Sequence, residues 1–155
     1  MSFMSIYVFV YGTLRAGEIN DLAQAAARRR LLPARYVGPA SVPGRLVDFG
    51  DWPGLIPVAD GRRVRGDVFE VEPALIALMD EIEGYEPGKP CCFVRREVAA
   101  RLEFPGEGPP EGPESGGSLT CQYYPIDPAL RGEAVDVAAD DWICYRRARR
   151  LPGCP

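Results

Sequence analysis

The sequence predicts a single α+β domain, and three features of the chain support that prediction. Residues 6–11 form an unbroken β-branched and aromatic run, which is typical of a strand buried on both faces. Residues 34–58 and 64–71 contain short apolar pieces separated by Gly and Pro, which indicates several strands meeting at bends. Residues 73–83 repeat apolar side chains at helical spacing. A length of 155 residues is enough for one domain with a core and too short for two ordinary ones.

The first strand opens into a turn that contains Gly12, and Gly17 follows five residues later. A buried strand that ends in a glycine turn presents backbone N–H groups with few side chains around them. Gly12, Thr13 and Leu14 are therefore candidate donors for an oxyanion or a carboxylate, without any charged side chain. The same pattern also fits an ordinary strand followed by a turn glycine, and the local sequence leaves both interpretations open.

The charge and the cysteines limit the classes of partner and compartment. A net charge of −4 argues against nucleic acid, because binding phosphates requires clustered cations. No apolar run approaches the roughly 20 residues of a membrane-spanning helix, and the first residues lack the pattern of a secretory signal. The five cysteines are odd in number and have no C-x-x-C spacing, so we expect reduced thiols in a cytoplasmic protein.

The chain contains no histidine. This absence excludes Ser-His-Asp and Cys-His catalysis and any metal site that uses imidazole. An enzyme with this sequence has to work with carboxylates, tyrosines, arginines and backbone groups.

Local signals place a helix and a turn in the first half of the chain. Asn20 or Asp21 can cap a helix that runs through the alanines to Arg30. Asp60 and Gly61 predict a hairpin turn before the strand at residues 64–71.

The second half contains a segment that has nothing to pack. Residues 105–118 include no apolar side chain, so we expect a mobile acidic loop joining two hairpin strands. The arginine-rich segment that begins at Arg146 is expected to form a peripheral, solvated tail.

The helix predicted at residues 73–83 ends in a carboxylate that faces the apolar side. Pro73 suits the first helical position, and Gly84 suits the residue just past the end. At 100° per residue, Glu83 projects into the apolar arc, whereas Glu81 points away and Asp80 lies at the border. Burial and the negative end of the helix both raise the pKa of such a carboxyl, as a general acid/base requires. A plain cap or salt bridge at the helix end explains the position equally well.

Several segments, in order along the chain, resemble the γ-glutamylcyclotransferase-like family, which includes γ-glutamylamine cyclotransferases and AIG2-like proteins. The run from Tyr11 to Gly17 is similar to the family's YGTL opening, and residues 79–85 are similar to its L-D-x-F-E-G-Y motif. Further similar segments are residues 44–55, 64–71 and 93–98, with Trp52 and Phe93 in place of other aromatic residues. The resemblance covers most of residues 6–104 and, more thinly, 119–145.

The resemblance implies a small mixed β-barrel with a few flanking helices and a pocket. It implies an enzyme that cyclises a γ-glutamyl group to 5-oxoproline and releases an amine or amino acid, with no cofactor or metal. By position, Glu83 is the catalytic general acid/base. The substrate-binding residues are then Tyr11, Gly12, Thr13, Leu14 and Tyr124, with Tyr123 as an alternative to Tyr124 and core packing as an alternative for both.

The expected partner is a small γ-glutamyl substrate, with no nucleic acid and no membrane, and the sequence leaves the oligomeric state open. Two other classes fit the same residues: a related enzyme that acts on another γ-glutamyl-type amide, and a non-catalytic binding module that keeps the pocket. A structural barrel whose motif matches are fortuitous is the plainest alternative. Retention of Glu83 together with the Tyr11–Leu14 turn favours an enzyme, because a mere binder gains little from burying a carboxylate.

Overall fold

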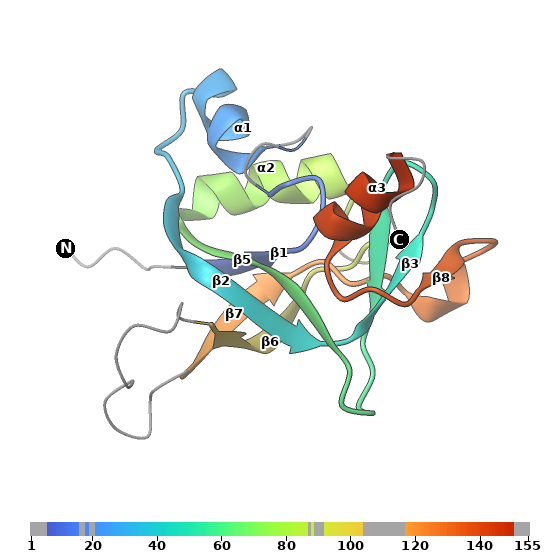
Figure 1. The fold of residues 1–155 in the computed structure, drawn as a ribbon. Helices are drawn as coiled ribbons and strands as arrows, with labels where there is room; N and C mark the ends of the chain where they lie inside the picture. The colour runs from blue at the N-terminus through green and yellow to red at the C-terminus, as the bar shows by residue number, and fades with distance from the viewer. Residues whose placement is uncertain are drawn as a thin grey trace.

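The computed structural model describes residues 6–15, 18, 21–86, 88, 92–103 and 117–150. Five strands form a closed barrel in the order β1-β5-β2-β6-β7 (Figure 1). Their bounds are Ile6–Val10 (β1), Arg35–Pro43 (β2), Arg63–Val71 (β5), Arg96–Leu102 (β6) and Ser118–Tyr123 (β7). Four of the five strand pairs are antiparallel, and the parallel pair of β1 with β7 closes the barrel. The mixed β-barrel that the family resemblance implied is therefore confirmed.

Strand β1 is covered on both faces, as its unbroken apolar sequence predicts. Val8 and Val10 belong to a cluster of buried residues shared with the first two helices. Phe9 belongs to a second cluster, which includes residues of the other barrel strands and Trp142. Because both faces of β1 are buried, its carboxyl end is fixed in the interior, and the turn that follows it begins there.

A second, three-stranded sheet has the order β4-β3-β8, with bounds Arg45–Asp48 (β3), Pro53–Ile56 (β4) and Val135–Val137 (β8). Asp60 does form a turn, since its carboxylate accepts a hydrogen bond from the Arg62 amide at 3.0 Å. The prediction of a hairpin there is wrong, because β4 pairs with β3 whereas β5 pairs with β1 and β2. The chain changes sheets at this turn.

The helices of the described residues flank the barrel (Figure 1). They are α1 (Leu22–Arg28), α2 (Pro73–Glu83) and α3 (Trp142–Arg150), and a short 3₁₀ helix covers Pro128–Leu130. Asp21 caps α1 by accepting hydrogen bonds from the Ala23 and Gln24 amides. Gly84 ends α2 at φ 70°, a left-handed conformation that suits glycine. The predicted starts and ends of α1 and α2 are thus confirmed to within two residues, whereas α3 and the 3₁₀ helix were not predicted.

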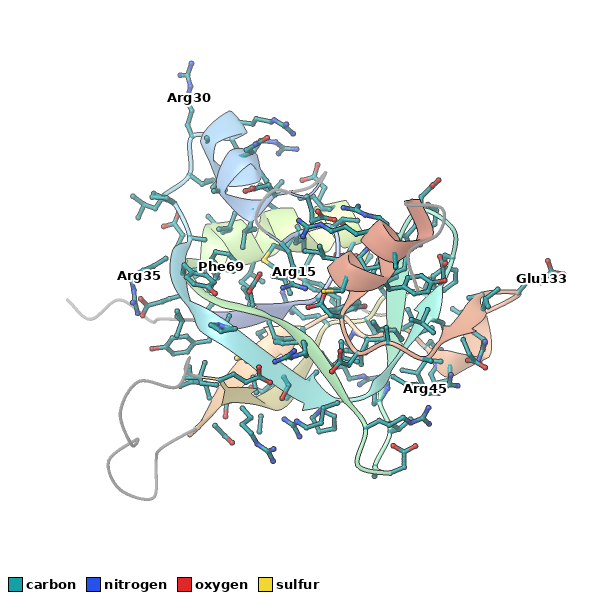
Figure 2. The ribbon with its side chains drawn as sticks, in the orientation of Figure 1. Arg15, Arg30, Arg35, Arg45, Phe69 and Glu133 are labelled. Atoms are coloured by element: carbon teal, nitrogen blue, oxygen red, sulfur yellow. The ribbon has the colours of Figure 1, made fainter. Side chains whose placement is uncertain are left out.

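Arg15 connects the opening turn to distant parts of the chain. Its guanidinium lies 3.0 Å from the carboxylate of Asp67 in β5 and 3.1 Å from that of Asp141, just before α3. Figure 2 shows Arg15 among the side chains in the middle of the molecule, whereas Arg30 points away from it. These two partly buried ion pairs hold the turn after β1 against the barrel.

None of the helices in the described part of the chain is long and apolar enough to cross a membrane. Most of the predicted mobile loop at residues 105–118 lies outside the described residues, as do Asn20, Cys91 and Cys154. The strands on either side of that loop, β6 and β7, pair with each other as a hairpin would.

Candidate functional site

A pocket of about 920 Å³ opens where segments from all parts of the chain meet. Its walls come from the end of β1 and the turn after it, the β3–β4 loop, the end of α2, and single residues of later segments. The lining residues are 9–14, Glu18, Phe49, 51–53, Ile82, Glu83, Cys92, Phe93, Tyr124 and Arg146. The structure therefore brings together all six residues that the sequence analysis assigned to the site.

The turn after β1 is held at both ends. The Arg15 amide donates to the Gly12 carbonyl at 3.0 Å, and the Leu22 amide donates to the Leu14 carbonyl at 3.2 Å. A Cβ atom at Gly12 would lie 2.6 Å from Cγ of Pro53, closer than non-bonded carbon atoms tolerate. Gly12 does not have a positive φ. The glycine is therefore required by the close approach of the β4 chain and not by a special backbone conformation.

Tyr11 lies buried in the pocket wall with its hydroxyl bound to backbone. The hydroxyl donates to the Tyr124 carbonyl at 2.7 Å and accepts from the Leu55 amide at 3.2 Å. Burial raises the pKa of Tyr11 well above its ordinary value, and the Glu83 carboxylate adds to the rise. Tyr11 thus ties the end of β7 to β4, and its ring forms part of the pocket wall.

Glu83 is the last residue of α2, and its carboxyl lines the pocket. No hydrogen bond or ion pair joins it to another residue in the described part of the chain. Removal from water raises the pKa of Glu83 from 4.5 to about 7. Glu81, by contrast, is exposed and pairs with Arg29 at 3.0 Å. The helical register predicted from the sequence is confirmed for both side chains.

The negative charge of Glu83 contributes to the raised pKa values of other side chains in the pocket. Burial, a hydrogen bond to Asp80 and, to a smaller degree, the Glu83 carboxylate raise the pKa of Tyr124. Burial, Asp127 and Glu83 together raise the pKa of the Cys92 thiol. Glu83, Tyr11, Tyr124 and Cys92 all line the same pocket.

Tyr124 is held by a carboxylate that the sequence analysis did not assign to the site. Its hydroxyl donates to Asp80 at 2.6 Å, and Asp80 pairs with Arg95 at 2.7 Å. Tyr123 packs in the other core cluster, with Phe9 and Trp142, and does not line the pocket. The sequence spacing could have assigned Asp80 to the site, because Asp80 lies three residues before Glu83. Residues at this spacing lie next to each other on one face of a helix.

A second missed feature is an ion pair at the pocket wall. Arg146 in α3 lies 2.6 and 2.7 Å from the two carboxylate oxygens of Glu18. The side chain of Glu18 is only 6% exposed and that of Arg146 22%. The expectation that Arg146 begins a solvated tail is therefore wrong, because α3 turns it inward on the same face as the fully buried Trp142.

The sequence of this chain is similar to those of known proteins. The family model described as gamma-glutamyl cyclotransferase, AIG2-like, matches residues 8–144. The chain is similar to the γ-L-glutamyl-butirosin B γ-glutamyl cyclotransferase of Niallia circulans, with 33% identity over 90% of this chain and 76% of the relative. It is also similar to the γ-glutamylaminecyclotransferase of Rattus norvegicus, with 29% identity over 76% of each chain.

Solved structures share the fold. The crystal structure of an AIG2-like protein from Mus musculus superposes with a TM-score of 0.61 and 22% identity, covering 83% of each chain. A uropathogenic E. coli-specific protein superposes with a TM-score of 0.65 and 15% identity, covering 94% of this chain and 98% of its own. Together with the family match over most of the sequence, these likenesses lead to one conclusion: the chain belongs to the γ-glutamyl cyclotransferase, AIG2-like family.

Proposed function

We propose that this protein is a γ-glutamyl cyclotransferase that converts a γ-glutamyl amide into 5-oxoproline and a free amine. The observation that carries the proposal is the carboxyl of Glu83, which lines the pocket with no partner among the described residues and has its pKa raised to about 7. A carboxyl in that state both accepts and donates a proton near neutral pH. The chain has no histidine, which is the side chain that usually fills this role near neutral pH.

The reaction needs only positioning and proton transfer. The α-amine of the substrate attacks its own γ-carbonyl, so the new C–N bond forms within one molecule and closes a five-membered ring. Glu83 first takes the proton that the attacking ammonium loses. After the tetrahedral intermediate forms, the same carboxyl returns that proton to the leaving nitrogen as the original amide C–N bond breaks. The ring nitrogen loses its second excess proton to the carboxylate of Glu83, which passes it to the released amine, so that the amine leaves as an ammonium ion and Glu83 is regenerated. No electron acceptor, metal or covalent enzyme intermediate is required for the balance.

The turn after β1 is our candidate for the anion-binding element. Gly12, Thr13 and Leu14 line the pocket, and the turn that they form is fixed by hydrogen bonds at both ends. Fixed amides stabilise an oxyanion without having to reorganise during the reaction. We assign them to the γ-carbonyl oxygen or to the α-carboxylate of the substrate, and we assign the Tyr124 ring to the wall against which the glutamyl chain folds.

The size of the pocket favours a substrate larger than a glutamyl group alone. Pockets for drug-sized ligands measure about 300–1,000 Å³, and this one lies near the upper end. The two relatives are named for a γ-L-glutamyl-butirosin B and for γ-glutamyl amines. We therefore propose that the remaining space holds the leaving amine. We also place the protein in the cytoplasm, where the free thiols of Cys92, Cys121 and Cys144 would stay reduced.

The test is an assay for 5-oxoproline with γ-glutamyl amino acids, γ-glutamyl amines and glutathione as substrates. The proposal expects catalytic release of 5-oxoproline from at least one class, with multiple turnovers and without added metal. Saturable binding of these compounds with no release of 5-oxoproline would instead identify a non-catalytic binding module.

A further inference from the structure

Two tyrosine hydroxyls of the pocket are bound to acceptors other than Glu83. Tyr11 and Tyr124 line the pocket with Glu83, and the charge of the Glu83 carboxylate contributes, after burial, to the raised pKa of each. The Tyr11 hydroxyl donates to the Tyr124 carbonyl at 2.7 Å, and the Tyr124 hydroxyl donates to Asp80 at 2.6 Å. A hydroxyl has one proton to donate. Neither hydroxyl therefore has a proton left for the carboxyl of Glu83.

Asp80 also holds a cation. Its second carboxylate oxygen lies 2.7 Å from the guanidinium of Arg95, and that guanidinium lies over the ring of Tyr85, 5.7 Å from its centroid. The side chains of Asp80 and Arg95 are only 19% and 29% exposed, so salt screens this pair weakly. Burial above all raises the pKa of Tyr124, and the charge of Arg95 partly offsets that rise. One carboxylate thus binds both a hydroxyl of the pocket and a cation whose charge reaches that hydroxyl.

Asp80 and Glu83 are neighbours on one face of α2. Side chains three residues apart on a helix have their Cβ atoms about 5–6 Å apart. Glu81, in contrast, is exposed and pairs with Arg29. A donor or a cation that Asp80 no longer bound would therefore have the carboxyl of Glu83 as its neighbouring acceptor on this helix face. Either one would favour the ionised form of Glu83 and oppose the effect of burial on its pKa.

The other titratable groups that face Glu83 are bound, neutral or exposed. Those of the described lining are Glu18, Asp51, Cys92 and Arg146. Arg146 of α3 is paired with Glu18. Burial raises the pKa of the Cys92 thiol, so the thiol is neutral near pH 7. Asp51, on the β3–β4 loop, is exposed to water. The donors and cations that could reach Glu83 from this lining and from Arg95 thus all have other partners.

We propose that Asp80 is a positioning residue for the acid/base: by binding the Tyr124 hydroxyl and the Arg95 guanidinium together, it keeps both away from Glu83. This inference rests on the proposed function, since it names the residue that leaves the proposed acid/base unpaired. Asp80 itself is not among the residues that line the pocket, so it acts through Tyr124 and Arg95 and not on the substrate.

The test is Asp80→Ala, with Glu83 followed in two ways. One is the ratio of kcat/KM at pH 6 to that at pH 8, with whichever γ-glutamyl substrate the parent cyclises. The other is the pH titration of the Glu83 carboxyl carbon by NMR, which needs no substrate. With a pKa of about 7, the parent should give a ratio of about one-tenth. The released hydroxyl and cation should make Glu83 about tenfold more acidic in Asp80→Ala, which raises the ratio to about one-half.

Removing the released groups as well should restore the behaviour of the parent. In the triple variant with Asp80→Ala, Tyr124→Phe and Arg95→Met, neither the hydroxyl nor the cation remains, so the ratio should return to about one-tenth. A merely structural role of Asp80 predicts the opposite, because two further substitutions would add to any loss of packing. In Tyr124→Phe alone, Asp80 and Arg95 stay paired, and Glu83 should titrate as in the parent.

Asp136→Ala is the matched control. Asp136 pairs with Arg45 and Arg131 outside the pocket lining, so its loss also leaves arginines without a carboxylate but should not change the ratio. Asp80→Asn keeps the size of the side chain and serves if Asp80→Ala does not fold. It leaves Arg95 without a carboxylate and should raise the ratio in the same direction.

The outcomes separate this inference from the proposed function. The positioning role is overturned if Asp80→Ala and Asp80→Asn titrate like Asp136→Ala, or if the raised ratio persists in the triple variant. It is overturned equally if Tyr124→Phe raises the pKa of Glu83, since the hydroxyl would then already donate to Glu83. Each of these results leaves the cyclotransferase proposal standing. Release of no 5-oxoproline by the parent would overturn the proposed function, while the NMR titration would still decide whether Asp80 controls the ionisation of Glu83.

Discussion

Replacing Glu83 by Gln tests the centre of the proposed mechanism. The amide keeps the shape of the side chain but neither accepts nor returns the proton of the reaction. General acid–base catalysis contributes roughly 10²- to 10⁴-fold, so Glu83→Gln should lower kcat by at least about 10²-fold. KM should change much less, because Glu83 is assigned to proton transfer and not to holding the glutamyl chain.

The pH dependence of the parent enzyme provides a second measure of the same group. With a pKa of about 7, the carboxyl of Glu83 is about half ionised at pH 7. At pH 6 only about one-tenth remains in the base form. The value of kcat/KM should therefore rise about tenfold per pH unit below pH 6, about fivefold from pH 6 to pH 7, and only about twofold above pH 7 until other groups titrate. An ordinary exposed Glu would give a profile that is flat from pH 6 upward.

The same substitution has a predictable effect on stability. The folded protein holds the pKa of Glu83 above its unfolded value of 4.5, so the unionised carboxyl favours folding below pH 4.5 and that benefit is lost as pH rises to about 7. A rise of this size corresponds to at most about 3 kcal/mol. Glu83→Gln should thus raise the free energy of unfolding by about 1 to 3 kcal/mol at pH 8 and by little at pH 4.5, as measured by urea unfolding.

Glu81→Gln is the control for both measurements. Its carboxylate is exposed and pairs only with Arg29, so its loss should leave kcat within about twofold and stability within about 0.5 kcal/mol. The reasoning is refuted if folded Glu83→Gln turns over the substrates of the parent at an equal rate. It is refuted equally if Glu83→Gln is less stable than the parent at pH 8, since the carboxylate would then be stabilising.

The remaining predictions concern the rest of the pocket and the loop outside it. Gly12→Val should destabilise the fold by about 1 to 3 kcal/mol through its contact with β4, and should lower kcat in the folded fraction; a folded variant with unaltered kinetics would remove the anion-binding assignment. Replacing residues 105–118 by a short glycine turn should change the free energy of unfolding by less than about 1 kcal/mol. A larger loss of stability, or a loss of activity in a folded variant, would show that this segment has a role at the pocket. Glu18→Gln should leave the guanidinium of Arg146 without its carboxylate partner and move the kinetic pKa assigned to Glu83 below about 7. A pH profile identical to that of the parent would show that Arg146 and Glu83 are not coupled.

Much of the fold follows from patterns within short segments. The unbroken apolar run of β1, the cap at Asp21 and the Pro73–Gly84 frame of α2 are local signals, and the structure confirms each of them. Pairing between distant strands is not a local property. The turn at Asp60 looked like a hairpin because its residues fit one, but the strands on its two sides belong to different sheets. The three-residue strand β8 is too short for a periodic pattern to reveal.

The candidate site also has one feature that the sequence predicts and others that it does not. The direction of Glu83 was predictable because a helix fixes the angle between its residues, and the neighbours in its own helix define the apolar side. The hydrogen bond between Tyr124 and Asp80 was not predictable, because these residues lie 44 positions apart and meet only when Tyr124, just after β7, packs in one cluster with residues of α2. The pair of Glu18 and Arg146 joins residues 128 positions apart, so no sequence spacing records it.

The arrangement of charges explains how a chain without histidine obtains a group that titrates near neutral pH. A carboxyl reaches that range only if it is taken out of water and kept away from cations, because a nearby arginine would lower its pKa again. In this pocket the cation of Arg146 is paired with Glu18, and that of Arg95 is paired with Asp80. Both arginines thus have a carboxylate partner, and burial raises the pKa of Glu83. The pairing of these arginines with carboxylates is therefore part of the proposed mechanism, since it leaves the carboxyl of Glu83 unpaired to move the proton.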